Sequence, residues 1–560
     1  MGQCPAGEVD WETLVRSIIL AATLALAAVP VGATTGDSPV WLLGRICHGE
    51  APPAIVGPHR LVMVAGMGDD HMDADTRSVE AQRWFDYGLT LGRSFEHADA
   101  ALAFQRAEAT DPSCSLCVAG EAWARGPTIN FGVSPEQTAA DLALAKHAQA
   151  LAGPQTTAPM RRFEAALVDR YQAGGDLRYA RDLDAMNRAS PDNVETAAFD
   201  AEAWLIMEWV GDPSGPTRAV AVLAPLVPRH SDVSGLVHFY IHATEDAGVP
   251  EQAEAYAPRL AELAPSASHM VHMPSHTYFR VGRYEDAALA NVAALKVDRA
   301  YAEKTSFPTP LGGLLYHFHN VRFGLGGALM AGDAKTGLAL VRLFNQDFPA
   351  PASYDPRAAQ AAGETYAALG RLAPPAEILS APDTVASNPQ LEAMRHYARG
   401  EAYLRLGDAR GLAREAEALG PAPAPEAAQS TADIVASIAR DCLAGDLAML
   451  RGHPAEGARR FAAAAALQDA RLAEKDDPPR WWFPVRRNLG AALLAEGDAA
   501  GAKRETDTVL ASWKLDPVTL AIRAAAERRL GESAAAASDR ASARRRWLGE
   551  PGVLAGRWLS

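Results

Sequence analysis

The stretch WFDYGLTLGRSFEHADAALAFQRAEATDP, residues 84–112, decides the fold. Small, aromatic and helix-ending residues stand at fixed positions in it: Trp84, Gly88, Ala100, Phe104, Ala107 and Pro112. Glycine and alanine let two antiparallel helices approach closely, aromatic rings fill the space between them, and proline ends the second helix. The stretch therefore predicts a pair of packed helices.

This spacing is typical of the tetratricopeptide repeat (TPR), whose period is about 34 residues. Further helix pairs are indicated by turns in which glycine precedes a polar residue, 34 to 50 residues apart: Gly282, Gly332, Gly370, Gly407, Gly452, Gly497 and Gly531. Alanine, leucine, arginine and glutamate usage favours helix throughout. We expect an all-α, TPR-like superhelix whose concave surface binds a protein, a peptide or a small ligand.

The composition, net charge and motifs of the chain limit the classes of function that it can have. Of the 560 residues, 48% are hydrophobic and 22% are charged, as in ordinary globular proteins. The net charge of −15 disfavours a nucleic-acid partner. The sequence has no Rossmann glycine fingerprint, P-loop, G-x-S-x-G elbow or kinase signature.

The N-terminus resembles an export signal. An apolar run from Ile18 to Val29 follows Arg16 and precedes small residues that end at Ala33. We expect residues 1–33 to be a cleaved signal peptide and the protein to be periplasmic or extracellular. An uncleaved membrane anchor through residues 17–33 is the alternative, and a cytoplasmic protein with a wrongly chosen start is a third reading.

The remaining chain divides into an N-terminal extension at 34–80, TPR-like repeats with the histidine-rich segment at 81–345, and further TPR-like repeats at 346–560. Two cysteines, Cys114 and Cys117, form a C-x-x-C pair. In an exported protein such a pair forms a disulfide, binds a metal or remains as two buried thiols. The sequence leaves these three alternatives open.

Histidines gather in two short motifs. HFYIHATE places His238 and His242 four residues apart, and HMVHMPSH contains His269, His272 and His276. A helix turns about 100° per residue, so a four-residue gap puts two imidazoles on one face, as in helical metal sites. We expect His276 near the start of a helix that begins at Pro274, with His269 and His272 in the loop that enters it.

Neutral imidazoles suit zinc, copper, iron and nickel. The predicted ligands of a divalent transition metal, zinc or copper, are His238, His242, His269, His272, His276 and His319. Glu245 is expected either to orient an imidazole or to act as general base. Packing or hydrogen bonding is the alternative role for each of these histidines.

Several of these segments resemble bacterial TPR-containing proteins that carry an HMPSH motif. They are 82–114, HFYIHATE at 238–245, 269–301, YHFHN at 316–320 and PPRWWFPVRRNLGAALL at 478–494. The family is described only as TPR-domain proteins, so the resemblance implies a helical solenoid with histidine-rich motifs and no particular activity. Its members tend to have histidine where this chain has Val233 and Arg322, which implies a reduced site if those histidines are ligands.

We therefore expect an exported TPR scaffold with a histidine-lined, metal-binding pocket on its concave face. A metal-dependent hydrolytic or oxidative enzyme with Glu245 as general base is the alternative, and an interaction scaffold without metal is the third. Geometry discriminates among them, because a metal site needs imidazole nitrogens that converge on one point about 2 Å away.

Overall fold

A computed structural model describes residues 60–307, 311, 314, 316–348, 356–381, 389–420, 430–472 and 478–554. These residues form helices joined by turns, with no strand among them. The predicted signal or anchor at 1–33 lies outside the described residues. None of the described helices is long and apolar enough to cross a bilayer.

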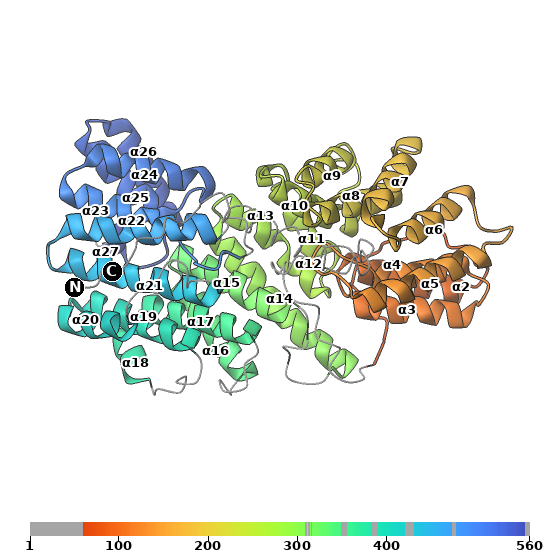
Figure 1. Cartoon of the computed structure of the whole chain (residues 1–560), viewed down its shortest axis with the longest axis horizontal. Coiled ribbons are helices and arrows are strands. Elements are labelled where there is room, and N and C mark those ends of the chain that lie inside the picture. The colour runs from red at the N-terminus through yellow and green to blue at the C-terminus, as the bar shows by residue number, and fades with distance from the viewer. Residues whose placement is uncertain are drawn as a thin grey trace, which may run out of the picture.

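The helices fall into two halves with three helices between them (Figure 1). The N-terminal half contains α2 (Val79–Arg93), α3 (His97–Thr110), α4 (Ser115–Arg125), α5 (Pro135–Leu151), α6 (Ala158–Arg170), α7 (Gly175–Ala189), α8 (Val194–Trp209), α9 (Gly215–Leu223), α10 (Ser234–Asp246), α11 (Ala257–Leu263) and α12 (Ser268–His272). The middle helices are α13 (Pro274–Arg280), α14 (Tyr284–Thr305) and α15 (His317–Ala331). The C-terminal half contains α16 (Ala334–Asp347), α17 (Pro356–Leu372), α18 (Pro375–Ser380), α19 (Pro389–Leu406), α20 (Ala409–Ala418), α21 (Thr431–Leu450), α22 (Pro454–Arg471), α23 (Arg486–Glu496), α24 (Ala499–Ser512), α25 (Pro517–Arg529), α26 (Ser533–Arg546) and α27 (Pro551–Leu554).

Neighbouring helices pack in pairs, and alternate helices also touch. Helix α2 packs on α3 and α4, α4 on α6, α8 on α10, α17 on α19, α19 on α21, and α23 on α25. This order gives two layers in which each pair contacts the next, as in a helical-repeat solenoid. The predicted all-α, TPR-like fold is confirmed.

Residues 84–112 form the predicted pair of packed helices, α2 and α3. Phe104 of α3 fills the space between α2 and α4 and is 1% exposed. A Cβ atom on Gly88 would lie 3.0 Å from the Phe104 ring, and one on Gly120 would lie 2.5 Å from it. Because neither glycine has a side chain, α2 and α4 can both pack directly against the Phe104 ring.

Six of the seven predicted turn glycines lie between two successive helices, as predicted, with φ between +69° and +103°, where glycine is favoured. The prediction for Gly370 is wrong, because α17 continues through it to Leu372. A Cβ atom there would lie 2.7 Å from the Cα of Ala398 on α19. Glycine is needed at this position for close helix contact and not for a turn.

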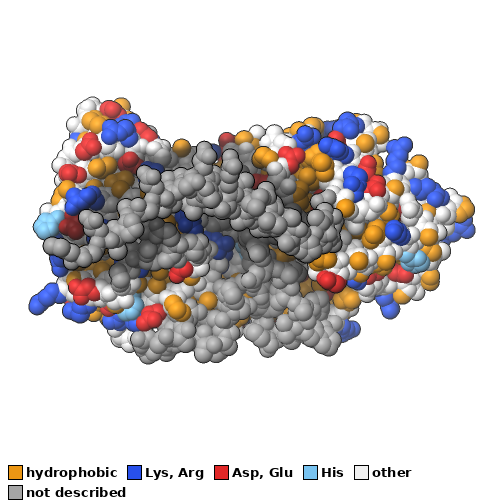
Figure 2. Space-filling model, in the orientation of Figure 1, with side chains coloured by type: hydrophobic (Ala, Val, Ile, Leu, Met, Phe, Trp, Pro, Cys, Tyr) orange, Lys and Arg blue, Asp and Glu red, His pale blue; other side chains and the backbone are white. Residues whose placement is uncertain are grey.

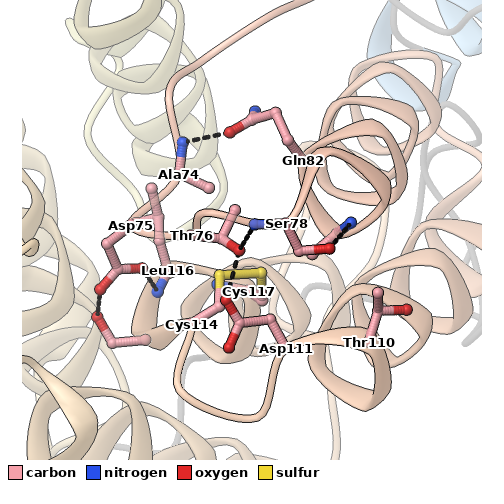
Figure 3. The surroundings of a disulfide bond; sticks show 12 residues. Ala74, Asp75, Thr76, Ser78, Gln82, Thr110, Asp111, Cys114, Leu116 and Cys117 are labelled. Carbon is pink, nitrogen blue, oxygen red and sulfur yellow. Dashed lines mark hydrogen bonds between the residues drawn. A yellow bond between two sulfur atoms is a disulfide. The ribbon is translucent and has the colours of Figure 1, made fainter.

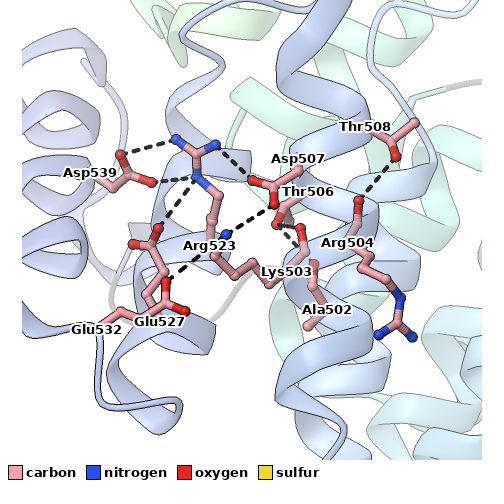
Figure 4. A network of polar contacts seen from close by, with 10 residues as sticks. All are labelled: Ala502, Lys503, Arg504, Thr506, Asp507, Thr508, Arg523, Glu527, Glu532 and Asp539. Carbon is pink, nitrogen blue, oxygen red and sulfur yellow. Dashed lines mark hydrogen bonds and ion pairs between the residues drawn. The ribbon is translucent and has the colours of Figure 1, made fainter.

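Charged side chains link successive C-terminal helices. Arg523 of α25 forms ion pairs with Asp507 of α24 at 2.9 Å and with Asp539 of α26 at 2.6 Å (Figure 4). On the face shown in Figure 2, basic and acidic side chains are interspersed over the described surface. This pattern differs from the continuous basic surface that nucleic acids favour.

Cys114 and Cys117 form a disulfide, which settles the three alternatives left open by the sequence (Figure 3). Both cysteines are buried at the start of α4. Beside them, the Asp75 carboxylate accepts hydrogen bonds from the Leu116 backbone N–H at 2.9 Å and from the Ser115 hydroxyl at 2.6 Å. These contacts tie the segment before α2 to the second helix pair.

The buried hydrophobic side chains of the described residues form two large cores. One contains buried side chains from Val64 to Tyr316, and the other contains side chains from Tyr278 to Trp513. The RWWF segment belongs to the second core, where Trp481 and Trp482 are buried and stacked. The cores meet at α13 to α15, so both histidine motifs lie at or beside this junction. The predicted domain boundary at 345 stays a prediction.

A test of helix packing compares two glycines inside helices. Gly120→Ala should lower the free energy of unfolding by about 1–3 kcal/mol, because the new methyl group overlaps the buried Phe104 ring. Gly326→Ala in α15 should leave it unchanged or raise it by about 0.5–1 kcal/mol, because the nearest atom lies at an ordinary 3.6 Å. Urea denaturation measures both, and equal midpoints would contradict the packing described for α2 and α4.

A second test concerns Asp200, a buried carboxyl of α8 that accepts a hydrogen bond from Asn187. Burial, together with the charge of Asp184, raises the pKa of Asp200 to about 7. A raised carboxyl pKa stabilises the fold below the unfolded-state pKa near 4, and this contribution is lost as the pH rises through 7.

Asp200→Asn should therefore stabilise the protein at pH 8 by on the order of 2 kcal/mol, with a smaller gain at pH 5. Urea denaturation at the two pH values measures the difference. The exposed Asp232→Asn is the control and should give no pH-dependent gain. A gain for Asp200→Asn that is equal at both pH values would show that the carboxyl does not titrate in this window.

Candidate metal centre

Helix α10 presents the first two histidines. His238 and His242 lie one turn apart on it, with ring centroids 4.9 Å apart. The helix starts close to the end of α2, where a Cβ atom on Gly235 would lie 2.5 Å from the Arg93 side chain. This close approach brings the His238 Nδ1 atom to 2.6 Å from the backbone oxygen of Arg93.

The second motif forms two short helices in nearly continuous succession. Pro274 occupies the first turn of α13, as predicted, and His276 lies in that turn. The prediction that His269 and His272 lie in a loop is wrong, because they belong to α12. The Met273 backbone N–H donates to the His269 oxygen at 2.9 Å and carries helical geometry up to α13.

One group of imidazoles joins α10 to α12. His238, His242 and His269 each place a ring nitrogen within 4.8 Å of the other two. The Nε2 atoms of His238 and His269 are 3.1 Å apart. All three side chains are buried. We call this group the first trio.

A second trio joins α12, α13 and α15. It consists of His272, His276 and His319, whose ligand atoms also lie within 4.8 Å of one another. The Nε2 atom of His272 is 2.8 Å from that of His276 and 3.0 Å from that of His319.

The two trios are neighbours. The rings of His242 and His276 are 5.5 Å apart, and those of His269 and His272 are 5.6 Å apart. The structure thus brings together all six histidines that the sequence proposed as ligands.

Neighbouring acceptors fix three of the tautomers. Glu245 Oε2 lies 2.6 Å from His276 Nδ1, and Asn291 Oδ1 lies 2.6 Å from His272 Nδ1. The Asn291 amide is oriented by its own Nδ2, which donates to the Ala287 oxygen at 2.8 Å. A carboxylate and carbonyl oxygens can only accept, so each facing Nδ1 must donate. His238, His272 and His276 therefore carry lone pairs on Nε2 when they are neutral.

The environment favours neutral imidazoles. Burial lowers the pKa of His238 to about 3. Burial is also the largest cause that lowers the pKa values of His242, His269 and His272 well below the ordinary value. Neutral imidazole is the form that binds metals.

Glu245 uses both carboxylate oxygens. Its Oε2 contacts His276, and its Oε1 accepts a hydrogen bond from Arg280 Nε at 2.7 Å. Burial acts to raise the pKa of Glu245, but His276 and Arg280 outweigh burial and hold it well below its ordinary value. Glu245 also lines a cavity of about 240 Å³ with Trp513 and Lys514. These contacts are those of a residue that orients His276, and the predicted general-base role stays a prediction.

Aromatic rings cover the trios. The Phe95 ring lies 4.5 Å from His238, 5.5 Å from His242 and 4.7 Å from His269, centroid to centroid. Phe95 has φ +62°, a left-handed conformation that costs a non-glycine residue on the order of 1–3 kcal/mol. Phe323 lies 5.2 Å from His272 in the second trio. The turn between α2 and α3 thus keeps a strained backbone that places an aromatic wall on the first trio.

Sequence reasoning missed Phe95, Asn291 and the Arg93 carbonyl. Only Phe95 had a sequence signal, because it lies in the turn of the best-defined repeat. The two positions where the resemblance implied lost histidines lie on the elements that carry His238 and His319. Val233 precedes α10 as its N-cap residue, and Arg322 of α15 pairs with Glu364 of α17 at 2.8 Å.

No family model matches this chain, and no curated protein matches it. Solved structures that resemble it include the human IFIT1 dimer with PPP-AAAA, at 12% identity over 82% of this chain and 89% of that chain, with a TM-score of 0.27. The APC/C hetero-tetramer Cut9-Hcn1 matches at 12% identity over 84% and 82%, with a TM-score of 0.30. The TPR domain of P58(IPK) matches at 12% identity over 75% and 99%, with a TM-score of 0.17. At these scores the likeness concerns helical-repeat architecture alone.

Proposed function

We propose that this protein is an exported TPR-like scaffold that binds a transition metal, zinc or copper, through its buried histidines. One observation carries the proposal. The Nε2 atoms of His272 and His276 face each other at 2.8 Å, although Asn291 and Glu245 orient both rings with their lone pairs toward that contact.

Two lone pairs at this distance repel unless a cation lies between them. A proton on His272 is disfavoured because burial lowers the pKa of this residue well below its ordinary value. A proton carried by His276, which pairs with Glu245 at 2.6 Å, is the competing cation, and metal content decides between the two. A metal ion accepts both lone pairs and that of His319. Bonds of about 2.0–2.1 Å to a tetrahedral zinc place ligand nitrogens about 3.3 Å apart. The His272 nitrogen would separate from the other two by a few tenths of an ångström.

Export and partner binding rest on separate features. A buried disulfide favours an oxidising compartment, in keeping with the apolar leader at 18–29. The C-terminal half contains a cavity of about 760 Å³ lined by Arg371, Arg405, Trp547 and other residues. Its mixture of charged and aromatic groups suits a peptide, a protein segment or a small ligand. Membrane attachment through residues 17–33 is the alternative to cleavage.

A metal-dependent enzyme is the second candidate. Three imidazoles leave a fourth position at zinc or copper open for water, dioxygen or substrate, as in catalytic sites. Glu245 contacts the second trio through His276 at 2.6 Å. In that role it would have to exchange a hydrogen bond with His276 or Arg280 for one with the reacting group.

Metal content tests the proposal. The full chain, purified without a polyhistidine tag, should contain at least one equivalent of zinc or copper by mass spectrometry. The double variant His272→Ala/His276→Ala should lose the metal of the second trio. His147→Ala removes an exposed histidine of α5 and should leave the content unchanged. A chain that is isolated empty and takes up neither metal on titration would refute the proposal.

The role of Glu245 gives a separate prediction. Glu245→Gln removes the charge that orients His276 and should weaken metal affinity by about 10–100-fold, as loss of a ligand-orienting partner does. Competition with a chromophoric chelator measures the affinity, and circular dichroism checks the fold. Glu251→Gln, an exposed acid that pairs with Lys514, is the control. Unchanged affinity in Glu245→Gln would favour the general-base role instead.

A further inference from the structure

We propose that the six histidines hold two copper ions, one in each trio, as a paired site. This inference rests on the proposed function and specifies its stoichiometry and metal. The first trio is a candidate by its own contacts, because its members come from α10 and α12 and share no residue with the second trio.

The first trio contains buried ring nitrogens that have no hydrogen-bond partner among the described residues. The Arg93 carbonyl fixes the His238 proton on Nδ1, so the lone pair on Nε2 points toward His269 Nε2 at 3.1 Å. His242 Nε2 is buried, and among the described residues it has no hydrogen-bond partner. The same is true of His269 Nδ1. A buried nitrogen without a partner is costly, and a metal ion bound to the three rings removes that cost at His242 Nε2. His269 offers the ion only one of its two nitrogens.

A single ion does not satisfy both trios. Ligands of one ion with bonds of about 2.1 Å lie at most about 4.2 Å apart, even on opposite sides of it. The described ligand atoms cluster within 4.8 Å as two groups of three and not as one group of six. The shortest nitrogen contacts, at 2.8, 3.0 and 3.1 Å, also lie within the trios. Two ions side by side fit this arrangement.

The donor set favours copper over zinc. All six ligands are imidazoles, which supply no negative charge, and the nearby Glu245 is already paired with Arg280. Two dications would bring four positive charges into a buried site with little compensation, which is costly. Copper in its monovalent state brings half that charge, and imidazole is a suitable ligand for copper. The rings of Phe95 and Phe323 against the imidazoles give the site apolar walls that suit ions of low charge.

The test titrates the full chain with copper(I) under anaerobic conditions against a chromophoric competitor, and in parallel with zinc. His242→Gln disables the first trio, and His319→Gln disables the second. The wild type should bind two copper equivalents, each single-trio variant one, and the combined variant none. His147→Gln should bind two. Thermal unfolding with chelator present identifies any variant that has lost its fold, and His238→Gln and His276→Gln then replace the affected substitutions.

The outcomes separate the two proposals. One equivalent in the wild type, lost in only one of the trio variants, would overturn the paired site and leave the proposed function standing. Two equivalents of zinc with no retention of copper would overturn the choice of metal. No uptake of either metal would remove both proposals together.

Discussion

Six buried imidazoles must be packed and oriented where the two hydrophobic cores of the solenoid meet. Contacts from several helices around the junction orient these rings. Helix α10 approaches α2 closely enough for the Arg93 carbonyl to accept from His238. Helix α14 supplies Asn291 for His272, and Glu245 is anchored by Arg280 before it reaches His276. Three of the six rings are thus oriented by a specific acceptor, whereas an ordinary repeat would place leucine and alanine there.

Much of the fold could be predicted from local sequence. Six glycine turns and the helix pair at 84–112 follow from backbone conformation and from close packing, which depend on neighbours in the chain. Gly370 shows where this reasoning stops. A glycine needed for contact with Ala398 looks the same in sequence as a glycine needed for a turn, and only the tertiary neighbour distinguishes them.

In the candidate site too, some features could be predicted from the sequence and others depend on tertiary packing. Residue type and spacings of three or four residues identified five of the six histidines, because helical geometry makes such pairs converge. His319 came from the separate YHFHN segment at 316–320. Their grouping into two trios was not predictable, since it depends on how α10, α12 and α15 approach one another. The groups that orient the rings were missed for a related reason. Every residue has a backbone carbonyl, so the sequence does not mark that of Arg93 as the acceptor for His238. Asn291 lies 19 residues from its partner His272.

The contact between His238 and the Arg93 carbonyl spans 145 residues, in an architecture whose contacts are otherwise mostly between neighbouring helices. The hydrogen bonds from Tyr301 to Asp99 and from Asn130 to the Tyr316 hydroxyl span similar distances along the chain, 202 and 186 residues. Together they join the beginning of the described solenoid to its middle. An open solenoid stretches like a spring, but a segment closed on itself resists extension as a ring does. The C-terminal half is closed in the same way, because the Tyr284 hydroxyl donates to the Lys514 oxygen at 3.1 Å and the Leu548 N–H donates to the Ala331 oxygen at 2.9 Å. Under tension applied at its two ends, both halves of this molecule would therefore resist extension.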